Sequence, residues 1–165
     1  MLQGAPVRIA VQRGLQVRNG KIVRRGGTEV HAATFIRRRR IVLDAELLDD
    51  DRELRRILVH ELFHFVWVRL GNGVRRSFEE LLARQINARG ELGWSSEYRK
   101  AELDSRDLRD RSRRWREFSC EAFCDTAAFI FARRKQHDEF TLAAVHCRKR
   151  IAWFRKNFGS GCIRI

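Results

Sequence analysis

The segment 57–68 is apolar at every position except His60, Glu61 and His64. A helix at a protein surface carries polar residues along one face, whereas a helix that is apolar all round is buried on most sides. Two histidines and a carboxylate inside such a helix cost free energy unless another group compensates them. The segment therefore predicts a central helix with a polar site buried in the fold.

The sequence before this helix differs in kind from the sequence after it. Short β-branched segments fill the first 45 residues, and Asn19-Gly20 between two of them predicts a hairpin. Ile41-Val42-Leu43 predicts a further strand. From residue 49 onward the spacing of apolar residues is helical, with expected helices over 51–70, 74–88, 96–103, 106–134 and 141–158. The sequence thus predicts an α+β fold.

Length and composition narrow the class of protein. The 165 residues suit one domain over 1–165, and no apolar run approaches the roughly 18 residues of a membrane span. The N-terminus lacks the apolar stretch of a secretory signal. We therefore expect a cytoplasmic protein without a membrane partner.

The chain is strongly basic. It has 35 Lys and Arg against 21 Asp and Glu, a net charge of +14, and only five of the basic residues are lysine. Such a charge suits an acidic partner or a nucleic acid, although an arginine excess also fits a GC-rich coding sequence. The run Arg37 to Arg40 favours a solvated connection or a charged edge strand, with phosphate contact as the alternative.

The polar residues of the central helix have the spacing of a metal site. His60 and His64 are one turn apart, so both imidazoles can reach one ion from the same face. Glu61 is rotated about 100° from His60, which lets its carboxylate approach a water at the ion without binding the ion itself. These residues predict a Zn²⁺ site, with manganese and iron left open.

A catalytic zinc site needs a third protein ligand. Trp67 and Leu70 occupy the positions where the extended pattern HExxHxxGxxH needs Gly and His, which excludes that class. Glu121 fits the role better than His137 or His146, because it lies one turn before Asp125 on an apolar helical segment. Glu117, one turn earlier, is its competitor. Asp125 could accept the ring N–H of a ligand histidine.

Four cysteines in this setting favour reduced residues rather than disulfides. Cys120 and Cys124 flank Glu121 and are interpreted as small buried residues. A second metal site that joins them to His146 and Cys147 is the alternative. Cys162, near the C-terminus, could also supply a thiolate that folds back onto the zinc.

The motifs His60-Glu61-Leu62-Phe63-His64 and Glu121-Ala122-Phe123-Cys124-Asp125 resemble those of the gluzincins, zinc metallopeptidases that pair HExxH with a downstream ExxxD helix. The small size resembles that of minigluzincins, and the strand before the helix resembles that of ImmA/IrrE-type peptidases. The resemblance implies a zincin-like domain, with His60, His64 and Glu121 as zinc ligands. It implies Glu61 as the catalytic glutamate and Asp125 as the carboxylate behind a ligand histidine.

The expected activity is hydrolysis of a peptide or protein substrate. Glu61 would take a proton from the attacking water as general base and pass it to the leaving amine. His137, His146 and Tyr98 are candidates for a second donor to the oxyanion. The alternative function is a basic nucleic-acid-binding or DNA-associated module whose HExxH is vestigial or structural.

Overall fold

A computed structural model describes residues 2–134, 136–159, 161 and 163–165, and confirms the α+β class. The strands are β1 (Leu2–Gln3), β2 (Arg8–Gln12), β3 (Gln16–Arg18), β4 (Lys21–Val23), β5 (Thr28–Glu29), β6 (Ala32–Phe35), β7 (Arg40–Asp44) and β8 (Ile163–Arg164). The α-helices are α1 (Asp51–Arg69), α2 (Asn72–Ala83), α3 (Trp94–Ala101), α4 (Ser105–Asp110), α5 (Arg113–Phe131) and α6 (Ala144–Phe158). Two 3₁₀ turns, η1 (Ile36–Arg38) and η2 (Ala45–Asp49), flank β7.

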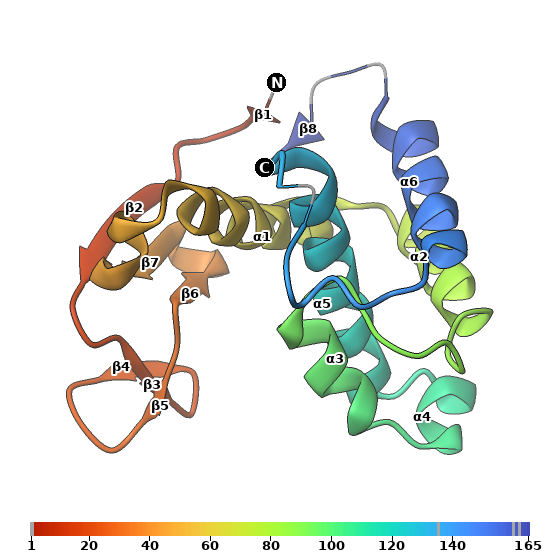
Figure 1. The fold of residues 1–165 in the computed structure, drawn as a ribbon, viewed down its shortest axis with the longest axis horizontal. Coiled ribbons are helices and arrows are strands. Elements are labelled where there is room, and N and C mark those ends of the chain that lie inside the picture. The colour runs from red at the N-terminus through yellow and green to blue at the C-terminus, as the bar shows by residue number, and fades with distance from the viewer. Residues whose placement is uncertain (1, 135, 160, 162) are drawn as a thin grey trace.

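Strands β2 to β7 lie on one side of the molecule and helices α2 to α6 on the other, and α1 runs between the two sides (Figure 1). One sheet has the order β2-β7-β6, in which β7 pairs parallel with β2 and antiparallel with β6. A second sheet has the order β4-β3-β5, and β1 pairs with β8 near the two chain ends. The expected hairpin is confirmed: β3 and β4 are antiparallel around Asn19 and Gly20, whose φ angles are 52° and 70°.

The position of α1 explains its apolar sequence. Phe63, Val66 and Trp67 pack into a cluster with side chains of α2, α5 and α6. Phe65 instead joins Ile41 in the cluster that covers the β2-β7-β6 sheet. Because both sides of α1 are covered, an apolar stripe on one face would not have been sufficient.

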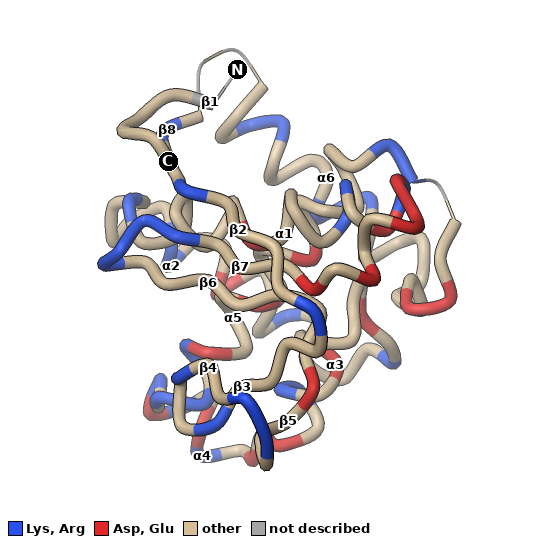
Figure 2. The backbone as a smooth tube through the Cα atoms, turned by 90° about the vertical axis from the view of Figure 1, so that its left-hand side faces the viewer, with Lys and Arg blue, Asp and Glu red and all other residues tan. Residues whose placement is uncertain are grey.

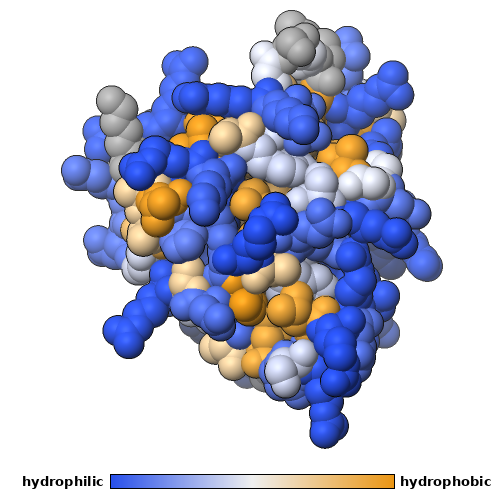
Figure 3. Space-filling model, turned by 90° about the vertical axis from the view of Figure 1, so that its right-hand side faces the viewer, coloured by the Kyte–Doolittle hydropathy of each residue, from blue (hydrophilic) through white to orange (hydrophobic). Residues whose placement is uncertain are grey.

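The helical half has a mostly hydrophilic outer face. Seen from the side of α2 and α6, apolar side chains appear in small groups between hydrophilic ones (Figure 3). None of the helices in the described ranges combines the length and apolar character needed to cross a bilayer.

The single helix expected over 106–134 is wrong, because the chain breaks it into α4 and α5. Arg111 ends α4 with a left-handed φ of 48°. Ser112 then begins α5, and its hydroxyl accepts a hydrogen bond from the N–H of Trp115. Asp104 and Asp107 form a capping box at the start of α4. Local capping thus outweighs the continuous helical spacing. The segment expected over 74–88 likewise ends as a regular helix at Ala83.

A buried ion network joins α3 to α6. Glu91, just before α3, lies 2.7 Å from an Nη of Arg150 and 2.9 Å from Nζ of Lys100. The Arg150 Nε donates to the Gln85 side chain at 2.9 Å. Arg150 is 0% exposed and Glu91 is 1% exposed. Removal of the Glu91 charge would leave Arg150 buried without its counter-ion.

We therefore expect Glu91→Gln to lower the free energy of unfolding by about 3–5 kcal/mol. Urea unfolding monitored by circular dichroism measures this change. Glu102→Gln is the matched control, because Glu102 pairs with Arg99 at 3.3 Å with both side chains 39% exposed. The control should cost less than about 1 kcal/mol. If Glu91→Gln lowered the free energy of unfolding no more than the small amount expected of the control, the buried network would not stabilise the fold.

Candidate metal centre

The helices that carry the two predicted motifs, α1 and α5, pack directly against each other. His60 and His64 lie one turn apart on the side of α1 that faces α5, with ring centroids 5.0 Å apart and planes at 75°. His60 is buried and His64 is half-buried. The spacing that suggested a metal site thus places both rings at one helix interface.

Glu121 on α5 reaches both histidines. Its Oε2 lies 3.2 Å from Nε2 of His60 and 3.9 Å from Nε2 of His64. Ligand atoms about 2.0–2.2 Å from a tetrahedral zinc lie roughly 3.3–3.6 Å from one another. The Glu121–His60 separation is close to this range and the Glu121–His64 separation is longer. The group whose ligand atoms all lie within 4.8 Å of one another is His60, His64 and Cys124.

Asp125 lies behind His60, one turn after Glu121. Its Oδ1 is 2.8 Å from Nδ1 of His60, and its Oδ2 accepts the Ser96 N–H at 3.0 Å. This position fits the predicted role, because an N–H donated from Nδ1 leaves Nε2 free to bind an ion.

The start of α3 supports Asp125, a contribution that the sequence pattern did not predict. A Cβ on Gly93 would lie 2.3 Å from the Asp125 carboxyl carbon, so only glycine allows the close approach. Ser96, in the first turn of α3, supplies the backbone N–H to Asp125. The sequence Gly93-Trp94-Ser95-Ser96 marks a helix start, but nothing local shows which carboxylate it holds.

The buried charges shift one another. Burial alone would lower the pKa of His60, but the Asp125 and Glu121 carboxylates raise it well above its ordinary value. Burial would raise the pKa of Glu121 and of Asp125, yet the neighbouring imidazoles bring both below their ordinary values. The site therefore favours a positive charge held between carboxylates.

Two cysteines that the sequence predicted to be small buried residues lie at the same site. Cys120 Sγ is 3.4 Å from Nδ1 of His64, and a hydrogen bond from Cys124 lowers the Cys120 pKa to about 6. Cys124 Sγ lies within 4.8 Å of a ring nitrogen of His60 and one of His64. The spacing signal was available, since Cys120, Glu121, Cys124 and Asp125 fall on one helical face.

The other ligand candidates have different partners. Glu117 pairs with Arg113 at 2.7 Å and with Arg99 at 3.5 Å, so it points to arginines and not to the histidines. His137 pairs with Glu53 at 3.2 Å. Cys147 donates to the Leu142 carbonyl in a separate cluster, apart from Cys120 and Cys124. Cys162 lies outside the described residues.

A cleft of about 400 Å³ lies beside the site; His60 and Asp125 are among the residues that line it, and His64 and Glu121 are not. His60 and Glu61 line it from α1, the segment from Thr28 to Ala32 forms one side, and Trp94 forms the other. Glu61 is 9% exposed, and that exposure is toward this cleft. The cleft thus brings the predicted catalytic glutamate and a predicted ligand to one accessible space.

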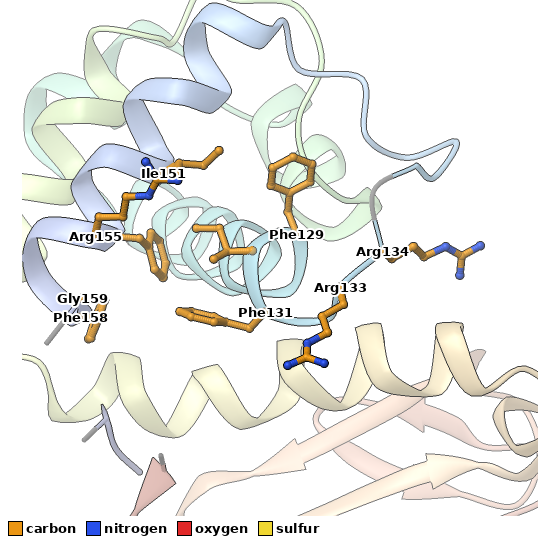
Figure 4. Close-up of a pocket in the computed structure, with 10 residues that line it drawn as sticks. Phe129, Phe131, Arg133, Arg134, Ile151, Arg155, Phe158 and Gly159 are labelled. Atoms are coloured by element: carbon orange, nitrogen blue, oxygen red, sulfur yellow. The ribbon is translucent and has the colours of Figure 1, made fainter. Parts of the chain in front are cut away.

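A separate cavity of about 590 Å³ lies between the end of α5 and α6. Phenylalanines 129, 131 and 158 line it, with Arg133 and Arg155 at its margin (Figure 4). None of its lining residues belongs to the predicted metal site, so the chemistry of the motifs is not located there.

No family model matches the chain, and neither a curated protein nor a solved structure matches it. Inference about this site therefore depends on its own donor set. Two imidazoles, a carboxylate and adjacent thiols form a set that suits zinc.

Substitution of the third ligand tests this donor set. We expect Glu121→Gln to weaken zinc binding by more than about 100-fold, and Asp125→Asn by about 10–100-fold. Competition with a chromophoric chelator measures both affinities. Cys124→Ser is the control and should change affinity by less than about tenfold. A large loss in Cys124→Ser with none in Glu121→Gln would instead identify the thiol as the third ligand.

Zinc affinity should also increase with pH. Burial lowers the pKa of His64, but the neighbouring Cys120 and Glu121 raise it to about 9. Metal binding requires a neutral imidazole, so protons compete with the ion below that pH. Affinity should rise at least about tenfold from pH 6.5 to pH 8.5. A pH-independent dissociation constant, after correction for the chelator, would contradict this picture of the metal-free site.

Proposed function

We propose that this chain is a zinc-dependent peptidase. The observation that carries the proposal is the convergence of Glu121 from α5 on His60 and His64 of α1. Glu61, also on α1, faces an open cleft. A metal site that only stabilised the fold would not need the Glu61 carboxylate beside it in a cleft open to solvent.

A bound Zn²⁺ supplies a Lewis acid that lowers the pKa of water and polarises a carbonyl group. His60, His64 and Glu121 would hold the ion. Asp125 accepts the Nδ1 proton of His60 and so fixes its tautomer and orientation. Glu61 takes a proton from the attacking water and delivers it to the leaving nitrogen of the peptide.

The sheet edge beside the cleft offers a binding mode for the substrate. β6 is the outer strand of the β2-β7-β6 sheet and contacts α1, and the segment 28–32 before and within it borders the cleft. An extended peptide can add to this edge by main-chain hydrogen bonds. The scissile bond would then lie beside Glu61.

The opposite side of the cleft carries an aromatic pair. Trp94 lines the cleft and stacks on Tyr98, with ring centroids 5.3 Å apart. Trp94 is 63% exposed, so its ring is available to an apolar substrate side chain. Tyr98, considered above as a donor to the oxyanion, is not among the residues that line the cleft.

Replacement of the general base tests the proposal. Glu61→Gln keeps the size of the side chain but removes its capacity to accept a proton, so kcat/KM should fall by about 100- to 10,000-fold. Activity is measured by incubating the zinc-loaded protein with a denatured proteome and identifying the cleavage products by mass spectrometry. Zinc content and thermal stability should stay unchanged.

Glu80→Gln, on the exposed face of α2, is the matched control and should retain full activity. Equal activity of Glu61→Gln and the unsubstituted protein would refute the role of Glu61. Absence of any cleavage by the zinc-loaded unsubstituted chain would refute the peptidase proposal itself.

A further inference from the structure

Positive charge is concentrated in the β-strand part of the chain. Residues 1–43 contain ten Lys and Arg and only one acidic residue, Glu29. The other 122 residues contain 25 basic and 20 acidic residues. A uniform arginine bias would have raised the basic content throughout but would not have removed acidic residues from one part. The view onto this side shows the basic positions along the β3–β4–β5 loops and the turn before β7 (Figure 2).

The charges in this part lack acidic partners within the described ranges. Every ion pair in the described ranges joins two residues from Asp50 onward, so none includes a residue of 1–43. Nine of the ten basic residues of 1–43 are exposed. The helical half therefore neutralises many of its arginines internally, whereas the strand half presents its own to solvent.

The exception, Arg39, shows that the run from Arg37 to Arg40 has two roles. Arg39 adopts a left-handed φ of 45°, and its guanidinium donates to the carbonyls of Ala5 and Pro6. It also lies 5.3 Å from the Phe65 ring centroid. Arg39 thus stabilises the fold, while Arg37, Arg38 and Arg40 remain exposed.

These exposed arginines line a groove. Lys21 and Ile22 of β4 form one side, and Phe35, Ile36, Arg37, Arg38 and Arg40 form the other, around a volume of about 600 Å³. We call this the basic groove. Four cations surround it, and the three large apolar side chains in it are half-buried.

From this groove we infer a second binding site in the molecule, for single-stranded nucleic acid. Guanidinium groups bind phosphates through paired hydrogen bonds, and three of the four cations are arginines. The Phe35 ring offers a face on which an unpaired base can stack. Cations around an apolar, aromatic floor are the combination that single strands require.

Other polyanions fit the groove less well. The apolar residues are recessed and cannot insert into a bilayer as an anchoring surface requires. A duplex keeps its bases stacked inside, so it would leave Phe35 without a partner. The inference is independent of the peptidase proposal, because none of the basic-groove residues lines the catalytic cleft.

Fluorescence anisotropy with labelled 12-nucleotide oligo(dT) and oligo(U) tests the inference on the full chain. Four phosphate contacts predict a slope of about −3 for log affinity against log salt concentration. The variant K21Q/R37Q/R38Q/R40Q should bind at least about tenfold more weakly at 50 mM salt, with a slope shallower than about −1. Phe35→Leu should weaken binding by about fivefold or more.

The variant R148Q/K149Q/R155Q/K156Q is the matched control, since it removes four exposed charges from α6 and has the same net charge. It should retain affinity within about threefold, and circular dichroism should show all variants folded. Equal weakening in both quadruple variants would overturn the inference. So would equal binding of a duplex, tighter binding to phosphatidylserine vesicles, or full displacement of the oligonucleotide by polyglutamate at equal charge.

Discussion

The structure depends on one buried interaction, the contact of His60 with two carboxylates of α5. Glu121 faces its Nε2 at 3.2 Å and Asp125 faces its Nδ1 at 2.8 Å. Carboxylates in a buried interface require a positive charge near them. A proton on the imidazole satisfies this requirement in the metal-free protein, and a divalent cation satisfies it better, because the cation also neutralises Glu121 beside His64. The same contacts that hold α1 against α5 therefore also position the side chains of the proposed metal site.

The rest of the fold serves to keep this contact in place. α1 is covered by the sheet on one side and by helices on the other. The helix therefore cannot rotate to bring its two histidines into solvent. α3 fixes Asp125 through the Ser96 N–H, and the Glu91–Arg150 pair ties the start of α3 to α6. Each support is remote in sequence from the motif it serves. Precise placement of ligands by surrounding packing and hydrogen bonds is what a functional metal centre requires.

The sequence predicted the features that are encoded locally. The all-round apolar helix, the Asn19-Gly20 hairpin and the shared helical face of His60 and His64 follow from local spacing. The approach of Glu121 to the two histidines is a contact between two helices, and spacing indicated only that Glu121 lies one turn before Asp125. Three features could not be predicted in this way. The break at Arg111 depends on capping that competes with helical spacing, the place of Cys124 depends on how α5 rotates against α1, and the basic groove depends on how two sheets pack. The first is a local competition between capping and helical spacing, and the other two are tertiary relations between segments far apart in the sequence.

The strand half takes part in both inferred sites, which constrains how it is attached. Its segment 28–32 borders the cleft beside His60 and Glu61, while β4 and the turn before β7 border the basic groove. Asp44, at the end of β7, connects the two sheets. Its carboxylate accepts the N–H of Leu15, just before β3, at 2.5 Å and the N–H of Glu46 at 3.0 Å. Burial would raise the Asp44 pKa, but these backbone donors lower it, so the anion is the form the fold selects. Because this anchor fixes the smaller sheet to the strand that leads into α1, the cleft and the basic groove keep a defined relation to each other.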